Sequence, residues 1–422
     1  MYHNFAKRTF LWIGLFIPVA VSAQNANKEN APYSRYGIGE LVFGSNTLLR
    51  GLGYASTAFN SKVSLNPDNP ASYAFLKNTT YEAGLMGSTR TLRTGGNTYT
   101  TGSASLAYLN IGIPVNKNVG LALGLRPQSR VFYHNIDSNR IDGIGKVVED
   151  YNGDGGLNYA YFGLAGKIKG FSLGVNAGYM FGTIQNTSRI MNIDTTNVLS
   201  SDFTTKTKIG GIYWKAGAQY ETILTKKLFM RLGATVTLNQ QLNADRENTA
   251  TSIRNIGTQV KDTVYISEIQ AGRIKLPMSY SFGAQIGGEK WSAIVDYTTT
   301  NWSQYRTYDR VDSVVDRTSR FSAGVEYTPN PGSVYKYLPR VTYRLGFYYG
   351  NDYVNLHNTE IKYYAVTAGM SLPFRRSSDR VHLAAEYGKK GTQSNNMVQE
   401  NFFKFTLGIS LNDKWFIKRR YD

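Results

Sequence analysis

From residue 80 to the C-terminus, the chain repeats runs in which apolar side chains alternate with polar or small ones. In the clearest run, Phe171, Leu173 and Val175 alternate with Ser172 and Gly174. Successive side chains of a β-strand point to opposite faces, so each run has one apolar face and one polar or small face. The pattern therefore predicts an all-β fold in which every strand separates two different environments.

The runs are too long for an ordinary soluble sheet. Strands of soluble sandwiches usually have about 5–6 residues, whereas most of these runs have ten or more, as a tilted membrane-crossing strand requires. We predict a 14-stranded antiparallel transmembrane β-barrel over residues 80–412. The expected strands are 80–93, 98–114, 119–134, 157–168, 171–187, 206–222, 227–242, 272–287, 290–306, 317–328, 338–350, 358–372, 380–390 and 399–412.

Short and long connections alternate between the first strands. Segments such as 169–170 and 288–289 are expected to be tight turns, while 135–156, 188–205 and 243–271 are expected to be long loops. This asymmetry is typical of outer-membrane barrels, whose short turns face the periplasm.

The N-terminal residues resemble an export signal. Lys7 and Arg8 precede an apolar stretch, and Val21-Ser22-Ala23 is a small-residue cleavage site. The apolar stretch is about a dozen residues, short of the ~20 that a membrane helix needs. We therefore expect 1–23 to be a signal peptide and the protein to reach the outer membrane of a Gram-negative cell. The basic segment 413–422 is expected to be a periplasmic tail, serving as an interface anchor or as a docking peptide.

The net charge of +18 raises the question of nucleic acid as a partner. The basic residues are dispersed rather than clustered, so nucleic acid is not expected. Anionic membrane lipid and lipopolysaccharide are better partners for such a charge. The chain has no Cys, which excludes disulfides and cysteine-based metal sites.

Signals for enzymatic or metal chemistry are weak, and we expect neither an enzyme nor a cofactor. Asp150-Tyr-Asn152-Gly-Asp154 has the opening spacing of a calcium loop, but position 12 is Tyr161 instead of Glu. A hydrolase is the main enzymatic alternative, because His382 lies on a predicted lumenal face beside Glu386. No GxSxG motif accompanies it, so a structural pair is expected.

Residues 24–79 do not alternate like strands and are rich in Gly, Ala, Ser, Asn and Pro. A barrel of fourteen strands has a lumen too wide for its own side chains to fill. Irregular backbone is tolerated at membrane depth when protein shields it. We therefore predict that 24–79 forms a lumenal hatch; a periplasmic leader is the alternative.

The hatch sequence carries a family resemblance. Tyr33–Gly39 (YSRYGIG), the Gly/Ala-rich run that ends in Asn69-Pro70-Ala71, and the fourteen strands that follow resemble the FadL-type transporters of fatty acids and other hydrophobic compounds. The start and the basic C-terminus are similar to a Bacteroidota branch. The resemblance implies passive uptake of a hydrophobic small molecule through a hatch-plugged barrel, with Asn69, Pro70 and Ala71 as the hatch motif. FadL-shaped barrels in Bacteroidota also serve secretion and barrel-assembly machines, so protein partners in the outer membrane are the alternative.

The resemblance also implies a sideways exit at a kinked third strand. Pro127 lies inside the third predicted strand, between Arg126 and Gln128. Proline has no N–H for the sheet ladder and is confined to edges and bulges. We expect these three residues to mark a lateral gate; an ordinary bulge without an opening is the alternative.

Overall fold

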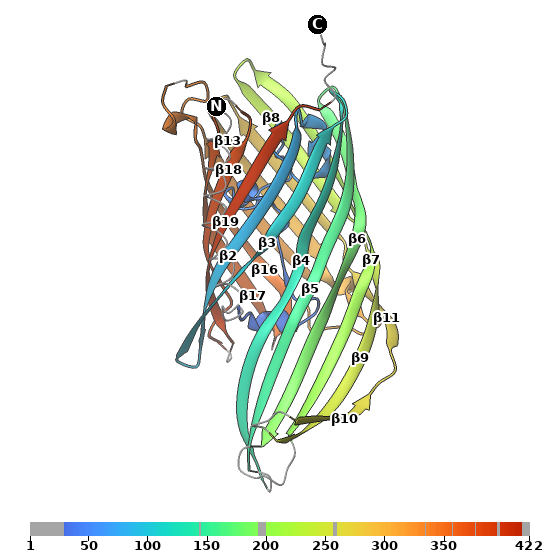
Figure 1. Cartoon of the computed structure of the whole chain (residues 1–422). Coiled ribbons are helices and arrows are strands. Elements are labelled where there is room, and N and C mark those ends of the chain that lie inside the picture. The colour runs from blue at the N-terminus through green and yellow to red at the C-terminus, as the bar shows by residue number, and fades with distance from the viewer. Residues whose placement is uncertain are drawn as a thin grey trace, which may run out of the picture.

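The computed structural model describes residues 29–142, 145–192, 200–255, 260–333, 335–356, 358–375, 377–394 and 397–415, which form a closed antiparallel barrel (Figure 1). The strands are β1 (Glu40–Leu41), β2 (Thr79–Thr94), β3 (Asn97–Pro114), β4 (Val119–Ile141), β5 (Gly145–Ile168), β6 (Phe171–Asn192), β7 (Ser200–Thr225), β8 (Leu228–Thr237), β9 (Gln240–Asn255), β10 (Val260–Ile266), β11 (Gln270–Leu276), β12 (Ser279–Gly287), β13 (Trp291–Asn301), β14 (Arg306–Thr307), β15 (Arg317–Tyr327), β16 (Thr342–Leu356), β17 (Thr359–Pro373), β18 (Arg380–Lys390) and β19 (Gln399–Asp413). The predicted signal and residues 416–422 of the predicted tail lie outside the described residues.

These segments make fourteen strand positions in the wall. Three positions are each built from two segments, β8 with β9, β11 with β12, and β13 with β14. The ring closes where β19 pairs with β2, from Gln399 opposite Arg93 to Asp413 opposite Thr79. The predicted 14-stranded antiparallel barrel is therefore confirmed. Pro277 separates β11 from β12, as expected for a residue that cannot donate to the ladder.

One half of the wall is longer than predicted. β4 and β5 stay paired as far as Ile141 opposite Gly145, and β6 and β7 as far as Ile190 opposite Ser201. The expected long loops at 135–156 and 188–205 were therefore wrong in their greater part, and most of 243–271 is strand as well. These extensions lie beyond the apolar band, where neither face needs to be apolar, so alternation did not mark them.

The two faces of the wall follow the sequence pattern. On β6, Phe171, Leu173 and Val175 are exposed on the outside, whereas Ser172 and Asn176 are buried inside. No helix in the described part of the chain is both long enough and apolar enough to cross a membrane. The helices are short: η2 (Pro32–Arg35), α2 (Thr47–Arg50), η3 (Pro70–Phe75), η4 (Trp302–Gln304) and η5 (Leu338–Arg340).

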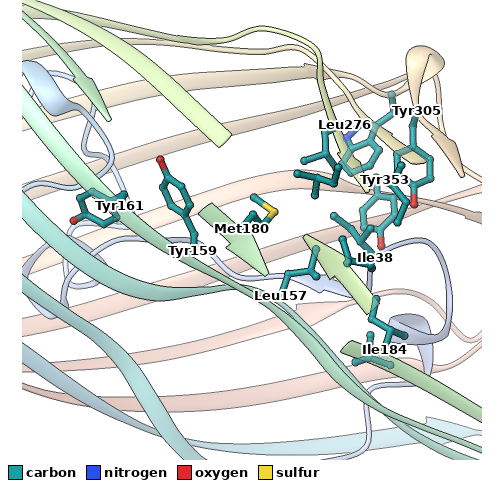
Figure 2. Packing of buried hydrophobic residues seen from close by; sticks show 14 of the residues in the cluster. Ile38, Leu157, Tyr159, Tyr161, Met180, Ile184, Leu276, Tyr305 and Tyr353 are labelled. Carbon is teal, nitrogen blue, oxygen red and sulfur yellow. The ribbon is translucent and has the colours of Figure 1, made fainter. Parts of the chain in front are cut away.

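The segment that precedes β2 packs against the inner face of the wall. Its side chains join the largest buried apolar cluster, in which Ile38 lies among Leu157, Met180 and Ile184 (Figure 2). Most of residues 45–60 are buried. The described part of the segment thus lies in the lumen, and we call residues 29–78 the hatch. The divisions at 23/24, 79/80 and 412/413 as functional boundaries stay predictions.

Candidate functional site

The wall is incomplete between β3 and β4. These strands are paired only from Leu109 opposite Leu125 to Pro114 opposite Gly120. Beyond this point β3 continues to Asn97 along β2, and β4 continues to Ile141 along β5, so the two edges separate (Figure 1). In a closed barrel every strand pairs with a neighbour along both of its edges. At this seam, the facing edges of β3 and β4 are not paired with each other.

A cavity of about 660 Å³ opens at this seam. Apolar side chains from three strands line it, namely Leu106, Leu125, Pro127, Phe132 and Phe181. Leu106 is exposed on the outside of the wall, so the cavity connects the lumen with the outer surface. We call it the lateral pocket. A second cavity, of about 930 Å³, follows the separating edges farther outward past Tyr99 and Ile136.

The hatch takes the place of β3 along part of the free β4 edge. β1 of the hatch pairs antiparallel with β4, with Glu40 opposite Arg130 and Leu41 opposite Ser129. The Val42 amide donates to the Gln128 carbonyl at 3.0 Å, and farther along the Ala31 amide donates to the Phe132 carbonyl at 2.7 Å. The seam is thus bridged from within by hatch backbone.

The three predicted gate residues lie together at this seam but make different contacts. Pro127 pairs with Asn158 of β5 and lines the lateral pocket. Gln128 is the extra residue of a β-bulge, because the register shifts between Pro127 and Ser129. The bulge and the opening therefore occur side by side. A gating role for these residues stays a prediction.

Arg126 points into the lumen and holds the hatch. Its guanidinium lies 3.0 Å from the Asp68 carboxylate and donates to the Gly44 carbonyl at 3.0 Å. Burial by itself raises the pKa of Asp68, but the positive charges of Arg126 and Lys215 outweigh this effect and lower the pKa to about 2. Asp68 also accepts a hydrogen bond from Ser45. Sequence reasoning placed Arg126 on the lumenal face without finding this partner.

The predicted hatch motif fastens the hatch to neighbouring strands of the wall, β6 and β7. Asn69 caps η3 by accepting from the Ala71 amide at 3.1 Å, and its side chain donates to the carbonyls of Thr57 and Ala218. A methyl group added to Gly174 of β6 would lie 2.5 Å from the Pro70 carbonyl carbon. The motif is fully buried. Its three residues act here in packing; a role in transport stays a prediction.

Other glycines of the wall, like Gly174, leave room for the hatch, which the sequence analysis did not predict. Each of these has hatch atoms where its Cβ would stand, so that the two backbones approach closely. They come from eleven strand segments: Gly112, Gly120, Gly163, Gly174, Gly217, Gly233, Gly283, Gly324, Gly346, Gly369 and Gly408. The available signal was a glycine on the polar face of most strands.

A second missed feature is a set of buried ion pairs. Arg90 of β2 contacts Glu29 at 3.1 Å and Glu40 at 2.7 Å, and it also pairs with Glu400 of β19. Burial raises the pKa of Glu40, but Arg90 and Lys390 hold it far below its usual range. Buried charges of this kind need close partners. The hatch is therefore bound to the wall by charge as well as by packing.

The weaker chemical signals have structural explanations. His382 is buried and contacts Ser371 at 2.6 Å and Ser410 at 3.0 Å. The expected pairing of His382 with Glu386 was wrong, because the Glu386 carboxylate is occupied by other side chains: Tyr54, Tyr348 and Lys404. His382 and Glu386 are four residues apart on β18, so their side chains share a face but contact different neighbours.

The segment with calcium-loop spacing belongs to β5, where Asp150 contacts His134 at 3.0 Å and accepts from Asn152. Among the described residues no group of three or more potential metal ligands occurs.

Comparisons with known proteins agree with this architecture. The toluene transporter TodX of Pseudomonas putida is similar in structure, with a TM-score of 0.60 and 14% identity over 89% of this chain and 99% of that chain. A FadL homologue of Pseudomonas aeruginosa has a TM-score of 0.59 and 13% identity, over 87% of this chain and 98% of its own. At these identities the likeness establishes the fold, a FadL-type outer-membrane barrel. No curated protein matches the sequence. The BamG family model matches residues 5–422, and the chain therefore belongs to the BamG family.

Proposed function

We propose that the protein is an outer-membrane channel for hydrophobic small molecules, which leave the barrel sideways through the lateral pocket. The observation that carries this proposal is the loss of β3–β4 pairing beside a cavity of about 660 Å³, which apolar side chains of β3, β4 and β6 line together with Glu29, Glu40, Arg126 and Arg130. The likeness in fold to TodX, a toluene transporter, also supports it.

The physical reason is the different cost of two routes. A hydrophobic molecule gains about 25 cal/mol for each Å² of apolar surface removed from water. A route through the periplasmic end would lead it back into water. The lateral pocket instead leads from an apolar lining to the lipid-facing side of Leu106 and Leu125. Fatty acids are one such class of ligand.

The test is to fill the lateral pocket. Ala104 of β3 lines it and is exposed. Ala104→Trp should slow the entry of a naphthylamine dye that fluoresces in lipid, measured on cells that carry the protein in the outer membrane. Ala293→Trp is the matched control, because Ala293 is half-buried on β13, where both neighbouring strands are paired. Equal dye entry in wild type and Ala104→Trp would refute a lateral route.

A second candidate function is docking of a protein partner outside the cell. The observation that favours it is the β9–β10 hairpin, on which Val264 is 70% exposed, Tyr265 57% and Ile266 60%. Among the described residues β10 pairs with β9 alone. Consecutive exposed apolar residues on an edge strand are typical of interaction sites. The match to the BamG family is compatible with this candidate.

This candidate is tested by purification from cross-linked outer membranes. Val264→Asp with Ile266→Asp should abolish recovery of a stoichiometric protein partner. Thr263→Asp, which adds a charge on the same exposed strand without removing an apolar side chain, should leave recovery unchanged. Absence of any stoichiometric partner from the wild-type preparation would rule the docking function out.

A further inference from the structure

A separate cavity lies inside the barrel, between the hatch and the wall. Its volume is about 280 Å³, and it is lined on one side by hatch residues 40–57 and on the other by β7, β8, β12, β13 and β15. We call it the inner chamber. It shares Glu29, Glu40, Arg126 and Arg130 with the lateral pocket, but it carries more charged and hydroxyl side chains than that pocket does.

The lining of the inner chamber carries an excess of positive charge. Eight basic side chains line it, against four acidic ones. The acidic groups are already paired. Glu29 and Glu40 contact Arg90, Asp68 contacts Arg126, and Asp352 contacts Lys390 at 2.5 Å.

Four of the basic groups form no ion pair among the described residues: Arg50, Arg130, Lys215 and Arg320. Arg50 donates instead to the Ser45 carbonyl and Arg130 to the Leu106 carbonyl. Within the described residues, neither Lys215 nor Arg320 has an acidic group within 4.0 Å. Arg320 lies over the Phe43 ring at 4.2 Å, and its Nε is buried without a hydrogen-bond partner. The Nε of the buried Arg126 is also without a partner. Burying a charge is costly unless an opposite charge and hydrogen bonds compensate it. A bound anion would therefore stabilise the basic side chains of the chamber.

The barrel strands that face the hatch across the chamber supply hydroxyl groups. Eight Ser and Thr side chains face it, two each from β8, β12, β13 and β15. Ser281 and Thr298 bond to each other at 2.9 Å, and Thr300 donates to Ser279 at 2.9 Å. Hydroxyls donate readily to an acceptor oxygen. A purely apolar occupant would leave both the hydroxyl groups and the positive charges without a hydrogen-bond acceptor.

We propose that the inner chamber binds an oxyanion, such as a phosphate group, between Lys215 of β7, Arg320 of β15 and the hydroxyl groups that face the chamber from β8, β12, β13 and β15. An oxyanion offers several acceptor oxygens, and its hydrogen bonds to charged donors are the stronger kind. The site is distinct from the lateral pocket and does not depend on lateral exit. The oxyanion is supplied either by a free solute or by a lipid head group.

The probe is inorganic phosphate, titrated into the full-length protein in neutral detergent by calorimetry. A second arm compares short-chain phosphatidic acid with the diacylglycerol of the same chains, each below its micelle concentration. Phosphate binding assigns a free solute as the source, and binding of phosphatidic acid alone assigns a lipid head group. Lys215→Met and Arg320→Met should each weaken binding by about tenfold or more, because a hydrogen bond to a charged group contributes about 1.5–3 kcal/mol.

Lys226→Met is the matched control, since Lys226 is exposed in a short turn away from the chamber. Its affinity should equal that of the wild type. The heat-dependent gel mobility of each variant reports whether its barrel is folded, and the two chamber substitutions are made separately so that one misfolded variant does not decide the result. The proposal is overturned if neither phosphate nor phosphatidic acid binds, if diacylglycerol binds as well as phosphatidic acid, or if both folded chamber variants keep wild-type affinity.

Discussion

Arg126 and Asp68 form an ion pair of 3.0 Å that joins the wall to the hatch, one residue before the proline at the β3–β4 seam. Both side chains are largely buried, at 6% and 16% exposed. The residue beside the lateral pocket therefore also holds the hatch in place. We therefore expect that loosening the hatch also affects the seam.

Removing the carboxylate should loosen the hatch. In Asp68→Asn, Arg126 loses its only carboxylate partner among the described residues, and breaking a buried pair costs about 3–5 kcal/mol. Hydrogen exchange of hatch peptides, measured by mass spectrometry, should become faster, while the wall strands stay protected. Asp309→Asn, at an exposed position, serves as control. Unchanged exchange in Asp68→Asn would mean that packing alone holds the hatch.

The same pair predicts how the hatch responds to acid. The pKa of Asp68 is lowered to about 2, below its ordinary value of 3.8, by Arg126 and Lys215 despite burial. Its contribution to stability is therefore full above about pH 4 and is lost as the pH falls through about 2. Conductance in planar bilayers should stay constant between pH 7 and pH 4. A rise in conductance near pH 5 would show that another group controls the hatch.

The close approach of hatch and wall can be tested at a single glycine. Gly174→Ala places a methyl group against the backbone of Pro70 and Ala71, and overpacking of this kind costs about 1–3 kcal/mol. Gly87→Ala is the matched control, because no atom lies within 4 Å of its added methyl group. Protease digestion of the hatch should accelerate in Gly174→Ala only. Equal digestion in both variants would contradict a tight backbone contact.

Deleting the hatch tests whether it plugs the barrel. A protein without residues 24–75 should conduct ions far better than the full chain, because fourteen strands enclose a lumen too wide for their own side chains to fill. Single-channel conductance in planar bilayers measures this directly. Similar conductance with and without the hatch would indicate that the wall or its outer extensions close the lumen.

The seam does not depend on the missing N–H of Pro127 alone. β3 leaves β4 at Leu109 and Leu125, so a new donor at position 127 finds no β3 partner. We therefore expect Pro127→Val to change both dye entry and thermal stability little. A marked loss of dye entry in a correctly inserted variant would assign the opening to the proline itself.

Much of the fold was determined by the sequence alone. Alternation in runs such as Phe171 to Val175 reports directly which face meets lipid, because the side-chain period of a strand is a local property. Fourteen such runs predicted the barrel, and the irregular composition of 24–79 predicted a hatch, of which residues 29–78 pack against the inner face of the wall. Alternation failed where β4 to β7 extend beyond the apolar band and where β9, β10 and the start of β11 replace an expected loop.

The tertiary structure decided everything that depends on contacts between distant residues. Arg126 and Asp68 are 58 positions apart, and nothing in either local sequence identifies the other as a partner. The same holds for the separation of β3 from β4, the glycines that receive the hatch backbone, and the basic groups of the inner chamber that have no carboxylate partner among the described residues. Periodicity fixes the direction of a side chain, but its partner is set by how the hatch folds against the closed wall.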